Sequence, residues 1–120
     1  MINVFVYGSL MKNYWNHHYL KDSEFLGQGT LNGYEMYQVS SFPGIVKKPG
    51  ENVLGEIYSI DEATLKALDR LEHEGYMYVR KEENLNIKNE VLKAYVYVWN
   101  QGIIPGYKKV KTMPWMAREG

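Results

Sequence analysis

One part of this chain has the sustained hydrophobic spacing of a helix, and extended segments dominate the rest. Leu65, Leu68 and Leu71 recur at a spacing that places their side chains along one helical face. Apolar runs and alternating patterns predict strands over residues 2–7, 24–30, 34–39, 45–48, 53–60, 76–87 and 91–99. One main helix among many glycine-interrupted strands indicates an α+β fold, a small, mixed, strongly curved β-barrel with a short flanking helix.

The ends of the helix and the connections between strands are also marked. Ser59 or Asp61 can serve as the N-cap, and Gly75 is the expected stop. Turns are predicted at residues 40–44, at residues 49–52 and around Asn89. The second of these, Pro-Gly-Glu-Asn, is typical of a hairpin loop. Residues 11–22 are predicted as a short helix or an irregular turn, and the chain after residue 101 as irregular.

Length and composition restrict the class of protein. A chain of 120 residues predicts a single domain over residues 1–120 that buries a core without disulfides or metal. The sequence has no cysteine, which excludes structural disulfides, cysteine-based zinc sites and a cysteine nucleophile. Fourteen basic and fourteen acidic residues argue against a nucleic-acid partner. No run approaches a membrane span and the opening lacks a signal peptide's charged start, so we expect no membrane partner and a cytoplasmic location.

Glu72 is a candidate acid–base residue because of its place in the helix. At 100° per residue it projects between Leu65 and Leu68, on the apolar face. Burial of a carboxyl group raises its pKa, which makes a glutamate useful as a general base or acid near neutral pH. The alternative is a side chain that turns out to solvent or pairs with Arg80.

The first predicted strand ends in Tyr7-Gly8-Ser9-Leu10, a second candidate site. Successive backbone N–H groups at a glycine corner can bind a carboxylate or a carbonyl oxygen, and the Ser9 hydroxyl could add a donor. An ordinary turn is the other interpretation.

Other catalytic classes find little support in the sequence. His17 and His18 are adjacent and His73 stands alone, which is typical of surface histidines and not of metal ligands. Ser9 lacks the G-x-S-x-G elbow of a serine hydrolase. The glycines of GQGTLNG have the wrong spacing for a dinucleotide loop. We therefore expect no metal and no cofactor.

Three segments in order, VFVYGSL (4–10), VLGEIYSI (53–60) and LKALDRLEHEGYMYVR (65–80), resemble the γ-glutamylcyclotransferase-like family, which includes γ-glutamylamine cyclotransferases and AIG2-like proteins. The resemblance runs from about residue 4 to residue 99. It implies a small mixed β-barrel with flanking helices. It also implies a substrate loop whose backbone holds the glutamyl group, formed by Tyr7, Gly8, Ser9 and Leu10, and a catalytic glutamate at Glu72.

The resemblance has one departure and two further matches. Many members have glycine directly after the catalytic glutamate, whereas here glycine follows Glu74, which keeps Glu74 as an alternative. The Leu-Asp spacing and the helical projection favour Glu72. The segment 78–80 matches a Tyr-x-Arg element, and the segment 55–58 matches a strand near the pocket.

The family implies a γ-glutamyl cyclotransferase acting on a small γ-glutamyl molecule. The substrate's α-amine attacks its own γ-carbonyl, which forms 5-oxoproline and releases an amine or an amino acid. One carboxylate could move the proton, so neither a metal nor an enzyme nucleophile is needed. The alternative is a non-catalytic binding module for a glutamyl-like or other small acidic ligand. Residues 11–22, 40–44 and 100–120 are expected to select the leaving group. Trp99, Tyr107 and Trp115 are candidates either for a wall of the pocket or for core packing, and the sequence assigns no oligomeric state.

Overall fold

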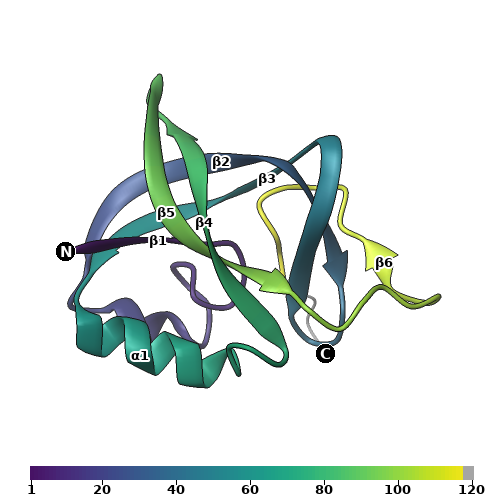
Figure 1. Cartoon of the computed structure of the whole chain (residues 1–120), viewed down its shortest axis with the longest axis horizontal. Coiled ribbons are helices and arrows are strands. Elements are labelled where there is room, and N and C mark those ends of the chain that lie inside the picture. Colours follow the sequence, from purple (N-terminus) through teal and green to yellow (C-terminus); the bar gives the residue numbers. More distant parts are fainter. Residues whose placement is uncertain (118–120) are drawn as a thin grey trace.

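The computed structural model describes residues 1–117, whose strands close into a mixed β-barrel (Figure 1). The elements in chain order are β1 (Ile2–Val6), the 3-10 helix η1 (His17–Leu20), β2 (Glu24–Gln38), β3 (Pro43–Ile60), α1 (Glu62–Leu71), β4 (Tyr78–Ile87), β5 (Glu90–Trp99) and β6 (Lys108–Lys109). Strands follow one another as β3–β1–β5–β4–β2, and pairing of β2 with β3 closes the ring. Because β1 and β5 are parallel while the other pairs are antiparallel, the barrel is mixed. The predicted fold class is confirmed.

The first strand lies between β3 and β5 and is buried on both faces. Its last three residues, Val4, Phe5 and Val6, are at most 3% exposed, which explains the absence of a polar stripe. Gly55 of β3 lies directly against this strand. A side chain at that position would collide with the Val6 carbonyl oxygen and the Phe5 ring, so glycine allows the close approach of β3 to β1.

The connection between β2 and β3, residues 39–42, overlaps the predicted turn at 40–44, and the β4–β5 hairpin turns around Asn89, as predicted. Lys88 and Asn89 both have positive φ, at 47° and 65°, which suits a tight hairpin turn. The two segments predicted at 24–30 and 34–39 form one continuous strand, β2.

The hairpin loop predicted at residues 49–52 is wrong. Strand β3 continues through these residues and is paired with β2 on both sides of residues 48–51, at Lys47 and at Asn52. The register shifts there, and the extra residues of β3 form a bulge beside Gly33 of β2. Gly33 and Gly50 have φ of +85° and +89°, so glycine on each strand relieves the backbone. The turn-forming sequence therefore bends a two-strand ribbon around the barrel (Figure 1).

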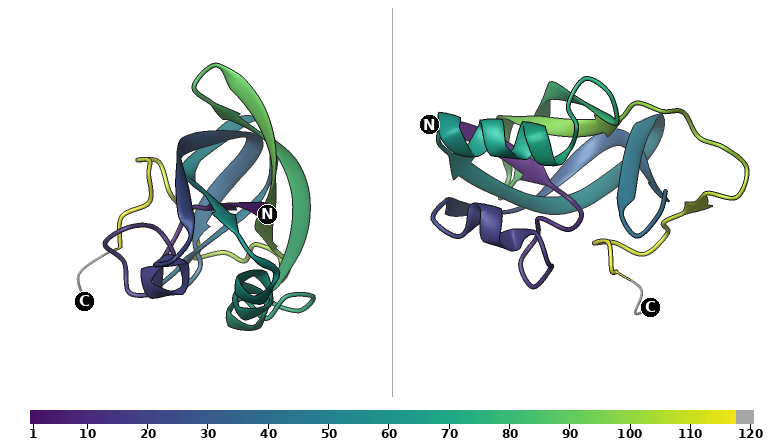
Figure 2. Two further views of the ribbon diagram at one scale, coloured as in Figure 1. Left: turned by 90° about the vertical axis from the view of Figure 1, so that its left-hand side faces the viewer. Right: turned by 90° about the horizontal axis from the view of Figure 1, so that it is seen from below.

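Helix α1 packs beside η1 at one end of the barrel (Figure 2). Asp61 is the N-cap: its Oδ1 accepts a hydrogen bond from the Thr64 amide at 2.7 Å. Ser59, the alternative cap, belongs to β3. Leu65 and Leu68 are buried, as the apolar stripe predicts. Neither helix in residues 1–117 is long and apolar enough to cross a membrane.

The C-terminal segment returns to the outside of the barrel and is irregular apart from β6 (Figure 1). Lys109 of β6 pairs with Tyr37 of β2. Trp115 is 1% exposed, so this segment buries an aromatic anchor although it has little regular structure. The two-residue strand was not predicted, because its pairing depends on a distant partner.

Candidate active site

Glu72 occupies the position where α1 ends. The helix stops at Leu71, four residues before the predicted stop at Gly75, because His73 adopts a left-handed φ of 48°. The Glu72 amide still donates to the Leu68 carbonyl at 2.9 Å, so Glu72 keeps the direction that helical projection predicts. The helix end thus sets where the carboxylate points.

A cavity of about 190 Å³ contains Glu72 and the end of the first strand together. Its lining comes from the β1–η1 loop, the β2–β3 turn, the end of α1 and strands β4 and β5, and comprises Phe5, Val6, Tyr7, Gly8, Ser9, Leu10, Trp15, Asn16, Ser41, Phe42, Pro43, Leu71, Glu72, Met77, Tyr78 and Tyr97. All five residues nominated from the sequence, Tyr7 to Leu10 and Glu72, line this one cavity.

Burial controls the protonation of Glu72. Desolvation raises the pKa of its carboxyl group from 4.5 to about 7. Within residues 1–117 no side chain or amide donates a hydrogen bond to this carboxylate. A carboxyl group in this state can accept and return a proton near neutral pH.

The loop after β1 presents free amides to the same cavity. Within the described part of the chain, the N–H groups of Gly8, Ser9 and Leu10 donate to no protein acceptor. A Cβ at Gly8 would lie 2.9 Å from the Pro43 Cγ, so glycine is needed for close packing on the β2–β3 turn. Three unpaired amides in succession can bind a carboxylate or a developing oxyanion.

Neighbouring side chains hold this loop in place. The Asn16 side chain donates through Nδ2 to the Ser9 hydroxyl at 2.8 Å, and the Asn16 backbone N–H donates to the Ser9 carbonyl at 3.0 Å. Glu56 accepts from the Lys12 amide at 2.9 Å. Glu56 does not line the cavity, so the segment 55–58 supports the loop through this hydrogen bond without contributing to the cavity wall.

Three tyrosines, Tyr7, Tyr78 and Tyr97, line the cavity together with Glu72. Tyr7 donates to the Tyr97 carbonyl at 2.6 Å, and Tyr78 donates to the Pro43 carbonyl at 2.7 Å. Burial raises the pKa of Tyr7, Tyr78 and Tyr97, and the nearby charge of Glu72 raises each further. All three phenols therefore remain neutral near pH 7.

Arg80, the residue considered as a partner for Glu72, pairs instead with Asp69. Its Nε lies 3.0 Å from Asp69 Oδ1, which also accepts from the Tyr97 hydroxyl at 2.7 Å. The arginine lies over the Tyr95 ring, 4.5 Å from the centroid. Among residues 1–117, Glu72 therefore has no ion-pair partner, and the bond to Asp69 orients Tyr97 at the cavity.

Glu74 lies outside the cavity. Its side chain is exposed and accepts a hydrogen bond from the Arg80 amide at 3.0 Å. The alternative alignment, in which glycine directly follows the catalytic glutamate, therefore selects a carboxylate at the protein surface. The structure separates the two glutamates that sequence alone left as alternatives.

The regions expected to select the leaving group contribute unequally. Trp15 and Phe42, from the first two of these regions, line the cavity, whereas no residue of 100–117 does so. Residues 118–120 lie outside the described residues. Tyr97 and Met77 also line the cavity and were not nominated; their contribution depends on how β4 and β5 meet α1, for which the sequence has no local signal. Within residues 1–117 no cluster of three His, Asp or Glu side chains could hold a metal ion.

Comparison with known proteins identifies similar chains of similar length. The family model for gamma-glutamyl cyclotransferase, AIG2-like, matches residues 4–117. The chain is 34% identical to the gamma-glutamylcyclotransferase family protein YtfP of Escherichia coli K12, over 98% of this chain and 99% of that protein.

Solved structures agree with the sequence matches. The solution structure of Escherichia coli ytfP has a TM-score of 0.71 at 33% identity and covers 96% of both chains. The crystal structure of a mouse aig2-like protein has a TM-score of 0.78 at 26% identity, over 89% of this chain and 82% of that chain.

Proposed function

This chain belongs to the gamma-glutamyl cyclotransferase, AIG2-like family, and on that premise we propose that it cyclises the γ-glutamyl group of a small molecule. The products are 5-oxoproline and the released amine or amino acid. The observation that carries this proposal is a carboxyl group with a pKa of about 7, at Glu72, in the same cavity as the free amides of Gly8 to Leu10.

Glu72 moves one proton between two nitrogen atoms. Its carboxylate accepts a proton from the substrate's α-ammonium, and the resulting amine attacks the γ-carbonyl carbon to form a tetrahedral intermediate. The bond from that carbon to the leaving nitrogen then breaks, and the carboxylic acid returns its proton to the leaving nitrogen. The new ring nitrogen loses its second proton to the departing amine or to solvent, which yields the neutral lactam. A pKa near 7 suits both transfers, because the group is a usable base and a usable acid at neutral pH.

The amides of Gly8, Ser9 and Leu10 supply the complementary donors. They bind the substrate α-carboxylate or the oxyanion that develops on the γ-oxygen, and both roles need preorganised N–H groups. Since the nucleophile and the electrophile belong to one molecule, holding that molecule folded supplies much of the acceleration. The proposed reaction needs neither a metal nor a cofactor.

The test is release of 5-oxoproline from a panel of γ-glutamyl amino acids and γ-glutamylamines. We expect Glu72→Gln to abolish turnover while ligand binding remains, since glutamine keeps the shape but accepts no proton. Glu74→Gln is the matched control and should keep full activity, because its exposed side chain lies outside the cavity. Full activity in Glu72→Gln would refute the proton-transfer role. Binding without turnover in the unmodified protein would identify a non-catalytic binding module.

A further inference from the structure

The cavity lining divides into a polar and an apolar portion. The polar portion contains Glu72 and the amide-bearing loop, whereas Trp15, Phe42, Leu71 and Met77 contribute apolar side chains. Trp15 both lines the cavity and is 52% exposed, so it lies where the cavity opens to solvent. A glutamyl group bound at Glu72 would direct its leaving group toward such an opening.

No basic side chain lines the cavity within residues 1–117. Glu72 is the only charged residue of the lining there, and the nearby Arg80 is engaged by Asp69. A leaving group that carries its own carboxylate would lose hydration without gaining a cationic partner, and it would face the charge of Glu72. An uncharged apolar leaving group meets neither penalty.

Trp15 is held in position by an aromatic cluster that includes the C-terminal segment. The Trp15 ring lies 6.1 Å from the Tyr14 ring and 6.1 Å from the Trp115 ring, both edge to face. The Tyr14 hydroxyl donates to the Trp115 carbonyl at 3.0 Å, and Trp115 Nε1 donates to Gln38 Oε1 at 2.7 Å. Trp115 therefore connects the opening of the cavity to strand β2.

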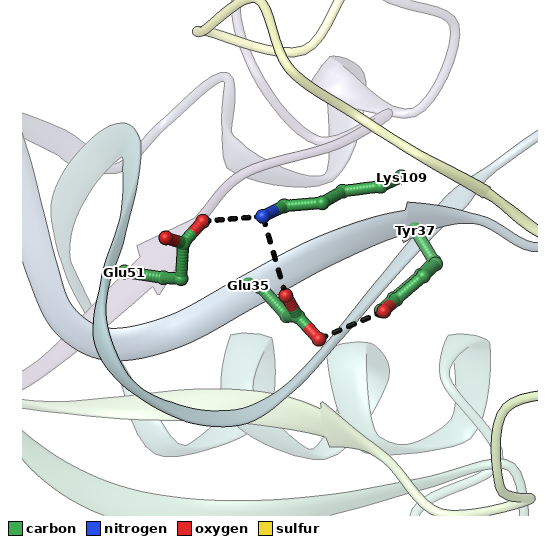
Figure 3. Close-up of polar contacts among 4 residues, drawn as sticks. All are labelled: Glu35, Tyr37, Glu51 and Lys109. Carbon is green, nitrogen blue, oxygen red and sulfur yellow. Dashed lines mark hydrogen bonds and ion pairs between the residues drawn. The ribbon is translucent and has the colours of Figure 1, made fainter.

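A polar cluster fastens the same segment to the β2–β3 ribbon (Figure 3). Lys109 Nζ lies 2.6 Å from Glu51 and 3.5 Å from Glu35, which also accepts from the Tyr37 hydroxyl at 2.8 Å. Glu51 belongs to the bulge of β3, and Lys109 belongs to β6. The segment is thus fixed a few residues before Trp115.

We propose that Trp15 is a specificity-determining residue that packs against an apolar leaving amine, and that Trp115 is the positioning residue that holds it there. The preferred substrates are γ-glutamyl amides of apolar amines without a carboxylate on the leaving group. This inference rests on the proposed function, because it assigns the leaving-group side of the same cavity.

Two matched substrates test the preference. γ-Glutamylphenethylamide and γ-glutamylphenylalanine differ only by the leaving-group carboxylate. We expect kcat/KM for the phenethylamide to be higher by about tenfold or more, as desolvation of an unpaired carboxylate would cause. Calorimetric binding of both compounds to Glu72→Gln measures the desolvation part of this preference without turnover, because glutamine carries no charge.

Variants of the two tryptophans test their roles against γ-glutamylmethylamide, whose methyl group offers Trp15 little apolar area to cover. Trp15→Ala should lower the phenethylamide-to-methylamide ratio of kcat/KM by about tenfold, mainly through KM, and Trp15→Phe should restore most of it. Trp115→Phe removes the hydrogen bond to Gln38. It should lower the phenethylamide-to-methylamide ratio of kcat/KM by less than Trp15→Ala does, and it should leave kcat for γ-glutamylmethylamide unchanged.

The outcomes separate the two proposals. Turnover or binding of both matched substrates with equal efficiency would overturn the specificity inference and leave cyclisation intact. An unchanged phenethylamide-to-methylamide ratio of kcat/KM in Trp15→Ala would also overturn the specificity inference and leave cyclisation intact. Absence of both turnover and binding for every γ-glutamyl compound would refute the proposed function itself, and with it the inference. Binding that favours the phenethylamide without turnover would support the inference and count against catalysis.

Discussion

Replacing Glu72 by glutamine should stabilise the protein at alkaline pH. The carboxyl group titrates at about 7 in the folded chain and ordinarily at 4.5, a difference of about 2.5 pH units. Each unit corresponds to about 1.4 kcal/mol, so an ionised Glu72 costs the folded state about 3 kcal/mol once the pH exceeds 7. Glutamine keeps the volume and carries no charge to desolvate.

The sign follows from proton binding. Between pH 4.5 and 7 the folded chain holds the Glu72 proton while the unfolded chain has lost it, so the free energy of unfolding falls as pH rises through this window. Below 4.5 both states are protonated, and above 7 both are ionised. The advantage of Glu72→Gln over the unmodified protein should therefore grow by about 2 to 3 kcal/mol between pH 5 and pH 8.

Urea unfolding followed by circular dichroism measures this difference directly. Both proteins are unfolded at pH 5 and at pH 8, and the two midpoints are compared at a shared m-value. Glu74→Gln controls for the change of net charge and should follow the pH dependence of the unmodified protein, because its side chain is exposed. If the stability difference between Glu72→Gln and the unmodified protein were the same at both pH values, Glu72 would not be a desolvated acid and the mechanism would lose its basis.

Three further results are expected. The pH profile of kcat/KM should rise through a pKa near 7 as Glu72 becomes a base, and steady-state rates between pH 5 and 9 would show it; a profile that is flat across this range would contradict this assignment. Gly8→Ala should lower the free energy of unfolding by about 1 to 3 kcal/mol, because its Cβ would lie 2.9 Å from the Pro43 ring, and thermal unfolding measures the loss. Tyr97→Phe should cost about 1 to 2 kcal/mol in urea unfolding, since Asp69 loses a hydrogen bond at 2.7 Å; no change would mean that water replaces the hydroxyl.

Local patterns were sufficient for much of the fold. The buried first strand, the apolar helical stripe and the hairpin around Asn89 follow from spacing and turn residues, and all are observed. The segment 49–52 shows where such reasoning ends. Its residues favour a turn, but whether a turn reverses a chain or bends it depends on the partner strand, here the opposing Gly33 of β2. That partner is 16 or more residues away in the chain.

The candidate site divides in the same way. Helical projection identified Glu72, because the residue after the last helical turn still continues the helical direction. The sequence left Glu74 open, and the left-handed conformation of His73 is what turns Glu74 away from the cavity. For Trp115 the sequence left a pocket wall and core packing open. The return of the C-terminal segment buries it against Trp15, outside the cavity lining.

The half-exposed Trp15 also makes the molecule its own fluorescent reporter. Trp99 and Trp115 are 8% and 1% exposed, so a soluble quencher such as iodide reaches mainly the indole at the cavity opening. A ligand that packs there would shield that indole and shift its emission toward the blue, while the two buried indoles would contribute a constant background. Occupancy of the cavity can therefore be followed without a label and without turnover.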